Sequence, residues 1–304
     1  MSAPPSAADV RRGFALGALG VAMFAMTLPM TRLAVGDVSA PQLSPAFVTA
    51  GRAAVAGGLS LLYLLWVRAH WPGRRHAGAL ALCAAGTVFG FPLFLGLALR
   101  EVDAMHAAVV TGVLPLGTAV VACLVLRQRP SLGFWVCALL GCALVLGFAG
   151  WRGGGRLSAA DGWLLLAVLS TSIGYVAGAR VSAVLPASHV ICWVLVGSLP
   201  LMLPLALWLA PWVPAAPLAT SAWVGFAYVS VFSMWLSFFA WYRGLTLGGV
   251  VRISQVQLIQ PFLALLFAVP VLGERLDAVT LLFSVAVIAT VVVGKRMPVQ
   301  AAAS

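Results

Sequence analysis

The sequence alternates between long apolar runs and short polar connections. Each run is about 20 residues long, which is the length that an α-helix needs to cross the hydrocarbon core of a bilayer. The connections hold nearly all the charged residues and many of the Pro and Gly residues. The pattern predicts ten membrane-spanning helices, over residues 13–35, 45–67, 77–99, 104–126, 131–150, 161–180, 188–210, 220–242, 250–271 and 277–294.

Composition excludes a soluble globular protein. Hydrophobic residues make up 62% of the chain and charged residues 8%, whereas soluble domains carry about 25% charged residues. The net charge of +11 does not indicate nucleic-acid binding, because the Arg residues are scattered in small groups between the apolar runs. We expect the lipid bilayer and a small-molecule substrate as partners and no nucleic acid, and the sequence is compatible with a monomer.

Basic residues in the connections predict how the chain lies in the membrane. With a cytoplasmic N-terminus, the inner segments hold twelve Lys and Arg residues and the outer segments hold five, Arg52 being left out because it lies within a span. Cytoplasmic loops of membrane proteins carry such an excess. We therefore expect both termini in the cytoplasm.

The two halves of the chain show a weak internal repeat. A shift of 146 residues places Pro115 on Pro261 and the polar turn 127–130 on the turn 273–276. Each copy begins with small residues, followed by a proline within the span, a Leu-rich stretch and a polar turn with Arg. A shift close to half the chain length indicates an internal duplication.

A duplication of five spans has a geometric consequence. Because five is odd, two such halves joined in series face opposite ways across the membrane, as in many secondary transporters. The predicted fold is an all-α membrane protein with two inverted five-helix repeats, 13–150 and 161–295, around a central cavity. Short cytoplasmic tails, 1–12 and 296–304, flank the repeats.

This arrangement resembles a known family. Ten spans in two halves, with the segment Leu272-Gly273-Glu274-Arg275-Leu276 closing the ninth span, are similar to the EamA-type branch of the drug/metabolite transporter superfamily. The resemblance covers residues 13 to 295 and is greatest to bacterial amino-acid exporters of the YddG type, although the turn 127–130 lacks the acidic residue. It implies a cavity lined by spans 1, 3, 4, 6, 8 and 9, and export across the bacterial inner membrane.

Acidic residues are missing from the interior of the spans. All seven Asp and Glu residues lie outside the spans or at their ends. A proton- or sodium-coupled carrier, or a carrier of cations, usually needs a carboxylate at membrane depth. We therefore expect a neutral or zwitterionic substrate moved by facilitated diffusion, with no cofactor and no metal site.

Two glutamines are candidate substrate ligands in the ninth span. Gln257 and Gln260 are three residues apart and share a helix face. An amide offers both donors and acceptors, so it can bind the carboxylate and the ammonium of a zwitterion without a charge of its own. Hydrogen bonding between helices is the alternative role.

Aromatic residues supply candidate walls for an apolar side chain. Tyr228, Phe232 and Trp235 follow one face of the eighth span, and Tyr175 lies in a polar patch of the sixth. Packing between helices is the alternative role for such residues. The other predicted substrate-binding residues lie in the first, third and fourth spans: Met23, Thr27, Phe91, Phe94, Thr111 and Pro115.

Four residues of the spans have more than one interpretation. Pro115 and Pro261 each remove a backbone donor, so they mark either a hinge beside a water-lined path or a fixed kink. Arg52, within the second span, is a candidate partner of Asp37 or of a helix end. His106, at the start of the fourth span, is either solvated or a proton carrier.

The combined features predict a secondary transporter that works by alternating access. We expect export of neutral or zwitterionic small molecules, amino acids including aromatic ones, and the alternative is a nucleobase, nucleoside or sugar derivative. An intramembrane enzyme is disfavoured because no base lies near the serines. The chain has no ATPase motif, and a channel is disfavoured because no continuous polar path is evident.

Overall fold

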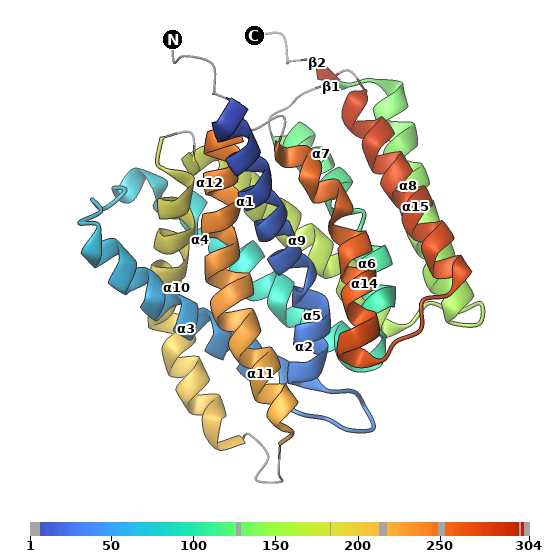
Figure 1. The fold of residues 1–304 in the computed structure, drawn as a ribbon, viewed down its shortest axis with the longest axis horizontal. Coiled ribbons are helices and arrows are strands. Elements are labelled where there is room, and N and C mark those ends of the chain that lie inside the picture. Colours follow the sequence, from blue (N-terminus) through green and yellow to red (C-terminus); the bar gives the residue numbers. More distant parts are fainter. Residues whose placement is uncertain are drawn as a thin grey trace.

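The computed structural model is a bundle of long helices with the N- and C-terminal ends on the same side (Figure 1). It describes residues 7–125, 129–182, 184–212, 218–248, 253–297 and 299–300. The ends of both predicted tails, residue 126 of the fourth predicted span and residues 127–128 of the first polar turn lie outside the described residues.

The first half of the chain contains eight helices in five crossings. They are α1 (Ala7–Ala25) and α2 (Thr27–Val35) in crossing 1, α3 (Pro45–Trp66) in crossing 2, α4 (Ala77–Ala84) and α5 (Phe91–Glu101) in crossing 3, α6 (Ala104–Thr111) and α7 (Leu114–Val125) in crossing 4, and α8 (Leu132–Arg152) in crossing 5. A 3₁₀ turn, Arg74–His76, precedes α4.

The second half repeats this plan. Its helices are α9 (Ala159–Ser182) in crossing 6, α10 (Ala187–Leu209) in crossing 7, α11 (Thr220–Tyr228) and α12 (Ser237–Gly248) in crossing 8, α14 (Gln260–Leu272) in crossing 9 and α15 (Ala278–Arg296) in crossing 10. A 3₁₀ turn, Ala210–Trp212, follows α10. Two short strands, β1 (Arg129–Pro130) and β2 (Val299–Gln300), pair in antiparallel fashion near the termini.

Among the described residues, eight crossings are long and apolar enough to span a bilayer. The helices Val256–Leu272 and Ala278–Gly294 are shorter but equally apolar. The ten crossings confirm the predicted all-α membrane fold.

Local sequence signals determine where several helices begin and end. The hydroxyl of Ser44 accepts a hydrogen bond from the N–H of Phe47 at 3.1 Å, and this cap starts α3. Asp277 caps α15 in the same way through the N–H of Thr280 at 2.8 Å. Gly273 ends α14 with φ of +69°, a conformation that glycine adopts without steric cost.

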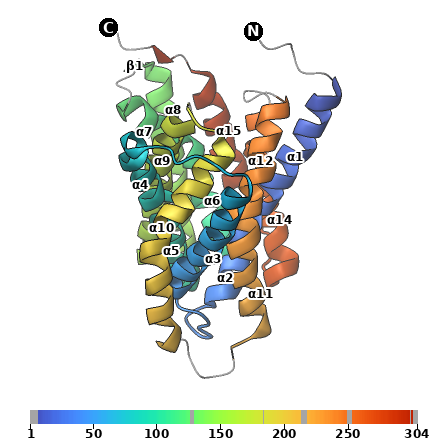
Figure 2. The same ribbon diagram turned by 90° about the vertical axis from the view of Figure 1, so that its left-hand side faces the viewer.

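The packing of the crossings follows an approximate two-fold symmetry between the halves. Crossing 1 packs against crossing 8 through α1 with α12 and α2 with α11, and crossing 6 packs in the same way against crossing 3 through α9 with α4 and α5. Crossings 2, 4 and 5 pack against their own counterparts 7, 9 and 10. The neighbouring pairs are visible in the two views of the bundle (Figures 1 and 2). Two inverted repeats produce this set of contacts.

The irregular turns of the helices also recur at matching positions. A π-helical stretch, Ala85–Gly90, joins α4 to α5, and another, Val229–Leu236, joins α11 to α12. The shift of 146 residues seen in the sequence places the first stretch within the second. The same shift places Leu114, where α7 begins, on Gln260, where α14 begins after a 3₁₀ turn.

Crossings 3 and 6 approach closely through glycines. A Cβ atom added to Gly174 would lie 2.8 Å from Cγ2 of Thr87 and 3.1 Å from the carbonyl oxygen of Cys83. A Cβ atom added to Gly86, on the facing helix, would lie 2.8 Å from Cα of Gly174. Small residues at such positions let two membrane helices pack backbone to backbone.

We expect Gly174→Val to lower the free energy of unfolding by about 1–3 kcal/mol, because overpacking forces the two backbones apart. Gly162→Val is the matched control, since it lies on the same helix and a Cβ atom there meets nothing within 4 Å. Thermal unfolding of both variants in detergent measures the difference. Equal losses in the two variants would contradict close packing at Gly174.

Candidate substrate cavity

A cavity of about 290 Å³ lies between the two halves of the molecule. Crossings 1, 3, 4, 6, 8 and 9, which the family resemblance implied, supply most of its wall, and crossings 2, 7 and 10 add Arg52, Ile191, Ile288 and Val291. The rest of the lining is Phe24, Thr27, Leu28, Thr87, Phe91, Ala108, Thr111, Gly112, Leu114, Pro115, Thr118, Thr171, Tyr175, Ser233, Met234, Phe238, Gln257, Leu258, Gln260, Pro261 and Ala264.

The structure places seven of the twelve predicted substrate-binding residues on this cavity. They come from five crossings and include both glutamines: Thr27, Phe91, Thr111, Pro115, Tyr175, Gln257 and Gln260. Hydroxyl, amide and aromatic groups that are far apart in the sequence therefore border one space. Their role in binding remains a prediction.

The other five predicted residues do not line the cavity. Phe94 stacks on Trp163 with the ring centroids 5.8 Å apart. The backbone carbonyl of Met23 accepts a hydrogen bond from the hydroxyl of Tyr228 at 3.1 Å. Phe232 stacks on Tyr228 and is 43% exposed, so it faces the lipid side of the bundle.

The aromatic face predicted for crossing 8 is displaced by its π-helical stretch. Trp235 contacts Phe239 at a ring-centroid distance of 5.0 Å instead of facing the cavity. A π-helix takes more residues per turn than the 3.6-residue period used to group the aromatic residues. Ser233, Met234 and Phe238 therefore face the cavity, and no sequence signal distinguished them.

Arg52 is the charged residue of the cavity wall. Its residue surface is only 3% exposed, and its Nη2 donates a hydrogen bond to the hydroxyl of Ser233 at 3.1 Å. The Ser233 hydroxyl lies 2.8 Å from the hydroxyl of Thr27. The expected pairing of Arg52 with Asp37 is wrong, because Asp37 contacts Arg32 at 3.6 Å in the connection after crossing 1.

Backbone carbonyls add acceptors at the breaks of crossings 4 and 9. Pro115 and Pro261 lack an N–H, so the carbonyls of Thr111 and Gln257 lose the donor that a continuous helix would supply, and the carbonyl of Gln257 accepts from the N–H of Gln260 instead. All five residues line the cavity. The hydroxyl of Thr111 donates to the carbonyl of Ala107 at 2.7 Å, which leaves its own oxygen free to accept.

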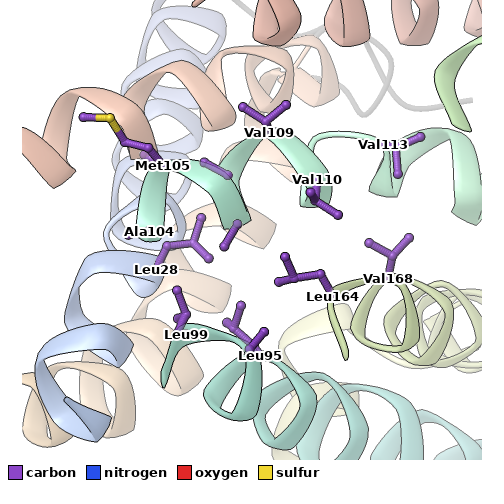
Figure 3. Close-up of a cluster of buried hydrophobic side chains, with 14 of the residues drawn as sticks. Leu28, Leu95, Leu99, Ala104, Met105, Val109, Val110, Val113, Leu164 and Val168 are labelled. Carbon is purple, nitrogen blue, oxygen red and sulfur yellow. The ribbon is translucent and has the colours of Figure 1, made fainter. Parts of the chain in front are cut away.

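An apolar cluster fills the bundle between the cavity and the end that carries the 36–44 and 273–277 connections. Leu28 of crossing 1, Leu95 and Leu99 of crossing 3 and Val110 of crossing 4 point toward one another, with Leu164 of crossing 6 beside them (Figure 3). Close packing of these side chains separates the cavity from that end of the molecule.

Polar contacts reinforce the same end. The carboxylate of Glu274, in the Gly-Glu-Arg turn of the second half, accepts hydrogen bonds from the N–H groups of Ala104 and Met105 at 2.7 and 2.8 Å. These groups start α6 of the first half, where a negative charge is favourable. Burial raises the pKa of Glu274, and the two hydrogen bonds oppose that shift.

His106 lies next to this contact and is buried. Its Nε2 is 2.7 Å from a carboxylate oxygen of Asp161, and both residues are about 5% exposed or less. The expectation that His106 is solvated is therefore wrong. The guanidinium of Arg32 donates to the backbone carbonyls of Leu99 and Val102, so crossing 1 is tied to crossing 3 at the same end.

The described residues contain no group of three or more His, Cys, Asp or Glu side chains that could hold a metal ion. The described cysteines are all free thiols, and only Cys142 is exposed. The chemistry available to the cavity is therefore hydrogen bonding, aromatic contact and the charge of Arg52.

Comparison with known proteins agrees with this architecture. The model of the EamA-like transporter family matches the chain twice, over residues 11–149 and 158–293. The uncharacterized transporter YdeK of Bacillus subtilis (strain 168) is 41% identical over 286 residues, which cover 93% of this chain and 97% of that protein. A solved structure, described as the crystal structure of a protein, shares the fold with a TM-score of 0.60 at 18% identity, covering 92% of this chain and 95% of that one.

Each of the two family matches contains five crossings, so the duplicated units cross the membrane in opposite directions. The matches and the curated relative agree with a multi-pass transporter and not with an enzyme. The chain belongs to the EamA-like transporter family.

Proposed function

We propose that this transporter exports neutral or zwitterionic small molecules by alternating access, and that its substrates are amino acids, including aromatic ones. The observation that carries the proposal is the composition of the cavity wall. Amide and hydroxyl groups and the rings of Phe24, Phe91 and Phe238 border one space in the middle of the bundle. Rings can cover an apolar side chain while the polar groups bind the amino-acid backbone.

The size of the cavity supports a small substrate. Its volume of about 290 Å³ is at the lower end of the range of roughly 300–1,000 Å³ for ligand pockets. An amino acid fills such a space, whereas a drug-sized molecule would require the helices to move apart. The resemblance to YddG-type amino-acid exporters in the bacterial inner membrane points to the same substrate class.

The proposed topology has both termini in the cytoplasm, as the distribution of basic residues predicts. The apolar cluster around Leu28, Leu99 and Val110 then closes the outer end of the cavity. Outward release requires this cluster to separate. Related halves with opposite orientations allow the closed end to alternate between the two sides.

We expect saturable efflux of labelled Trp, Phe, Thr or Met from liposomes that contain the purified protein. Gln257→Ala raises the KM for the transported amino acid roughly fivefold or more, because it removes hydrogen bonds of about 1 kcal/mol each. Phe232→Ala is the control, since that ring lies on the lipid side of the bundle and leaves the cavity wall unchanged.

Efflux of no amino acid by the wild-type protein would refute the substrate assignment. The same liposomes loaded with a nucleobase, a nucleoside and a sugar derivative then test the alternative substrates. An equal effect of Gln257→Ala and Phe232→Ala would instead show that Gln257 does not contribute to binding.

We also expect the efflux rate to be independent of a proton gradient. The described cavity wall contains no Asp or Glu, so it lacks the group that usually binds a coupling proton. The measurement compares initial efflux with and without an imposed pH difference across the liposome membrane. A severalfold acceleration that a protonophore abolishes would show proton coupling.

A further inference from the structure

Arg52 brings an uncompensated positive charge into the middle of the bundle. Among the described residues, the ion pairs are Arg32 with Asp37, His106 with Asp161, and Arg152 with Asp277, and none includes Arg52. The residue is 97% buried, since only 3% of its surface is exposed. It lies seven residues after Pro45, the first residue of α3, and so well inside crossing 2.

The guanidinium uses few of its hydrogen-bond donors. One bond from Nη2 reaches the hydroxyl of Ser233, whereas the buried Nε and Nη1 atoms have no partner among the described residues. Arg carries five N–H donors in a planar fork that matches a carboxylate. Because Arg52 borders the cavity, a molecule inside the cavity can contact the guanidinium and compensate its charge.

A role in packing alone does not account for this arrangement. Removing a charge from water within a membrane protein is costly unless a partner compensates it. Met or Leu would fill the same space between crossings 2 and 8 without that cost. The hydroxyl of Ser233, which is itself hydrogen-bonded to the hydroxyl of Thr27, holds one edge of the guanidinium in place, as supporting groups do for a ligand-binding side chain.

We propose that Arg52 is the site at which this transporter binds a carboxylate of its substrate. The inference rests on the proposed function and narrows it: the substrate must carry a negative charge, which excludes neutral nucleobases, nucleosides and sugars. Arg52 is the one Arg or Lys on the described cavity wall, so it matches a single carboxylate better than a phosphate dianion. The ammonium of a zwitterion finds acceptors at the carbonyl and the hydroxyl oxygen of Thr111.

The chain of hydrogen bonds from Arg52 through Ser233 to Thr27 also links crossings 2, 8 and 1. A purely structural Arg52 would make Arg52→Gln less stable and leave the preference for carboxylates unchanged. If Arg52 binds the ligand, we expect the opposite effects of Arg52→Gln on stability and on the preference for carboxylates. Removing its unpaired charge leaves thermal stability unchanged or raises it, and the preference for carboxylates disappears.

The first experiment measures thermal unfolding in detergent with benzoate or its neutral isostere benzamide as the probe. We expect benzoate, and not benzamide, to raise the Tm of the wild-type protein. Arg52→Gln weakens the apparent affinity for benzoate about tenfold or more, because it removes charge-assisted hydrogen bonds. Arg152→Gln is the control, since Arg152 pairs with Asp277 outside the cavity and its loss leaves the benzoate effect intact.

Arg52→Lys keeps the test decisive if Arg52→Gln does not fold. Lys retains the charge without the planar fork, so we expect weaker binding that still favours benzoate over benzamide. Equal effects of benzoate and benzamide on the wild-type protein would overturn the proposal. An unchanged affinity of Arg52→Gln for benzoate would overturn it as well.

The second experiment measures inhibition of labelled tryptophan efflux by tryptophan and by tryptophanamide, which lacks the carboxylate. We expect tryptophan to inhibit at least tenfold more strongly. The role of Arg52 is refuted if tryptophanamide inhibits tryptophan efflux as strongly as tryptophan does and the Arg52→Gln variant still transports tryptophan. That outcome leaves the proposed function intact. An Arg52-dependent benzoate effect without efflux of any amino acid refutes the amino-acid assignment and leaves the carboxylate site intact.

Discussion

Lipid offers no hydrogen-bond partner, so each polar group within the crossings must be satisfied by the protein or face a water-filled space. Several hydroxyls satisfy this constraint within their own helix. Ser198 donates to the carbonyl of Val194 at 2.8 Å, and Ser237 donates to the carbonyl of Ser233 at 2.6 Å. Arg52 departs furthest from the rule, since it has two buried atoms, Nε and Nη1, without a partner among the described residues, whereas eight other residues have one such atom each. Its position on the cavity resolves the departure, because a bound substrate or water can accept there.

The same constraint explains where the backbone is irregular. Crossings 4 and 9 break at Leu114 and Gln260, and crossings 3 and 8 contain π-helical stretches. Breaks in membrane helices leave carbonyls that need a polar neighbour, which a central cavity supplies. Because the halves are related by an approximate two-fold axis, the irregular segments of crossings 3 and 4 recur in crossings 8 and 9. The cavity therefore lies where the two sets of irregular segments meet.

Contacts between the halves distinguish the two ends of the molecule. Glu274 from the second half caps α6 of the first half, and His106 of α6 pairs with Asp161 of α9. The corresponding turn of the first half, 127–130, has no acidic residue that could make the equivalent contact. The sequence asymmetry between the two turns thus has a structural counterpart. The carboxylate of Glu274 ties one end of the bundle together, and the turn 127–130 has no carboxylate at the matching position.

Crossing 8 shows most clearly which properties depended on tertiary structure. The apolar length of the segment 220–242 predicted its position in the chain, and the structure has α11 begin at Thr220. The face that meets the cavity was predicted from a 3.6-residue period, which pointed to Phe232 and Trp235. Because the helix contains a π-helical stretch, Ser233 and Phe238 line the cavity instead. Periodicity reports a face only when the helix keeps its regular geometry.

The sequence by itself determined the membrane environment, the ten crossings and the duplication, because runs of about 20 apolar residues and a shift of 146 are properties of the linear chain. It also identified Gln257 and Gln260 as polar groups that required a partner. Only the tertiary structure placed Arg52 beside Ser233 and away from Asp37, since residues 181 positions apart meet through helix packing that no local pattern encodes. The sequence shows the charge of Arg52, and the fold leaves that charge without a counter-ion among the described residues, because helix packing decides which side chains meet.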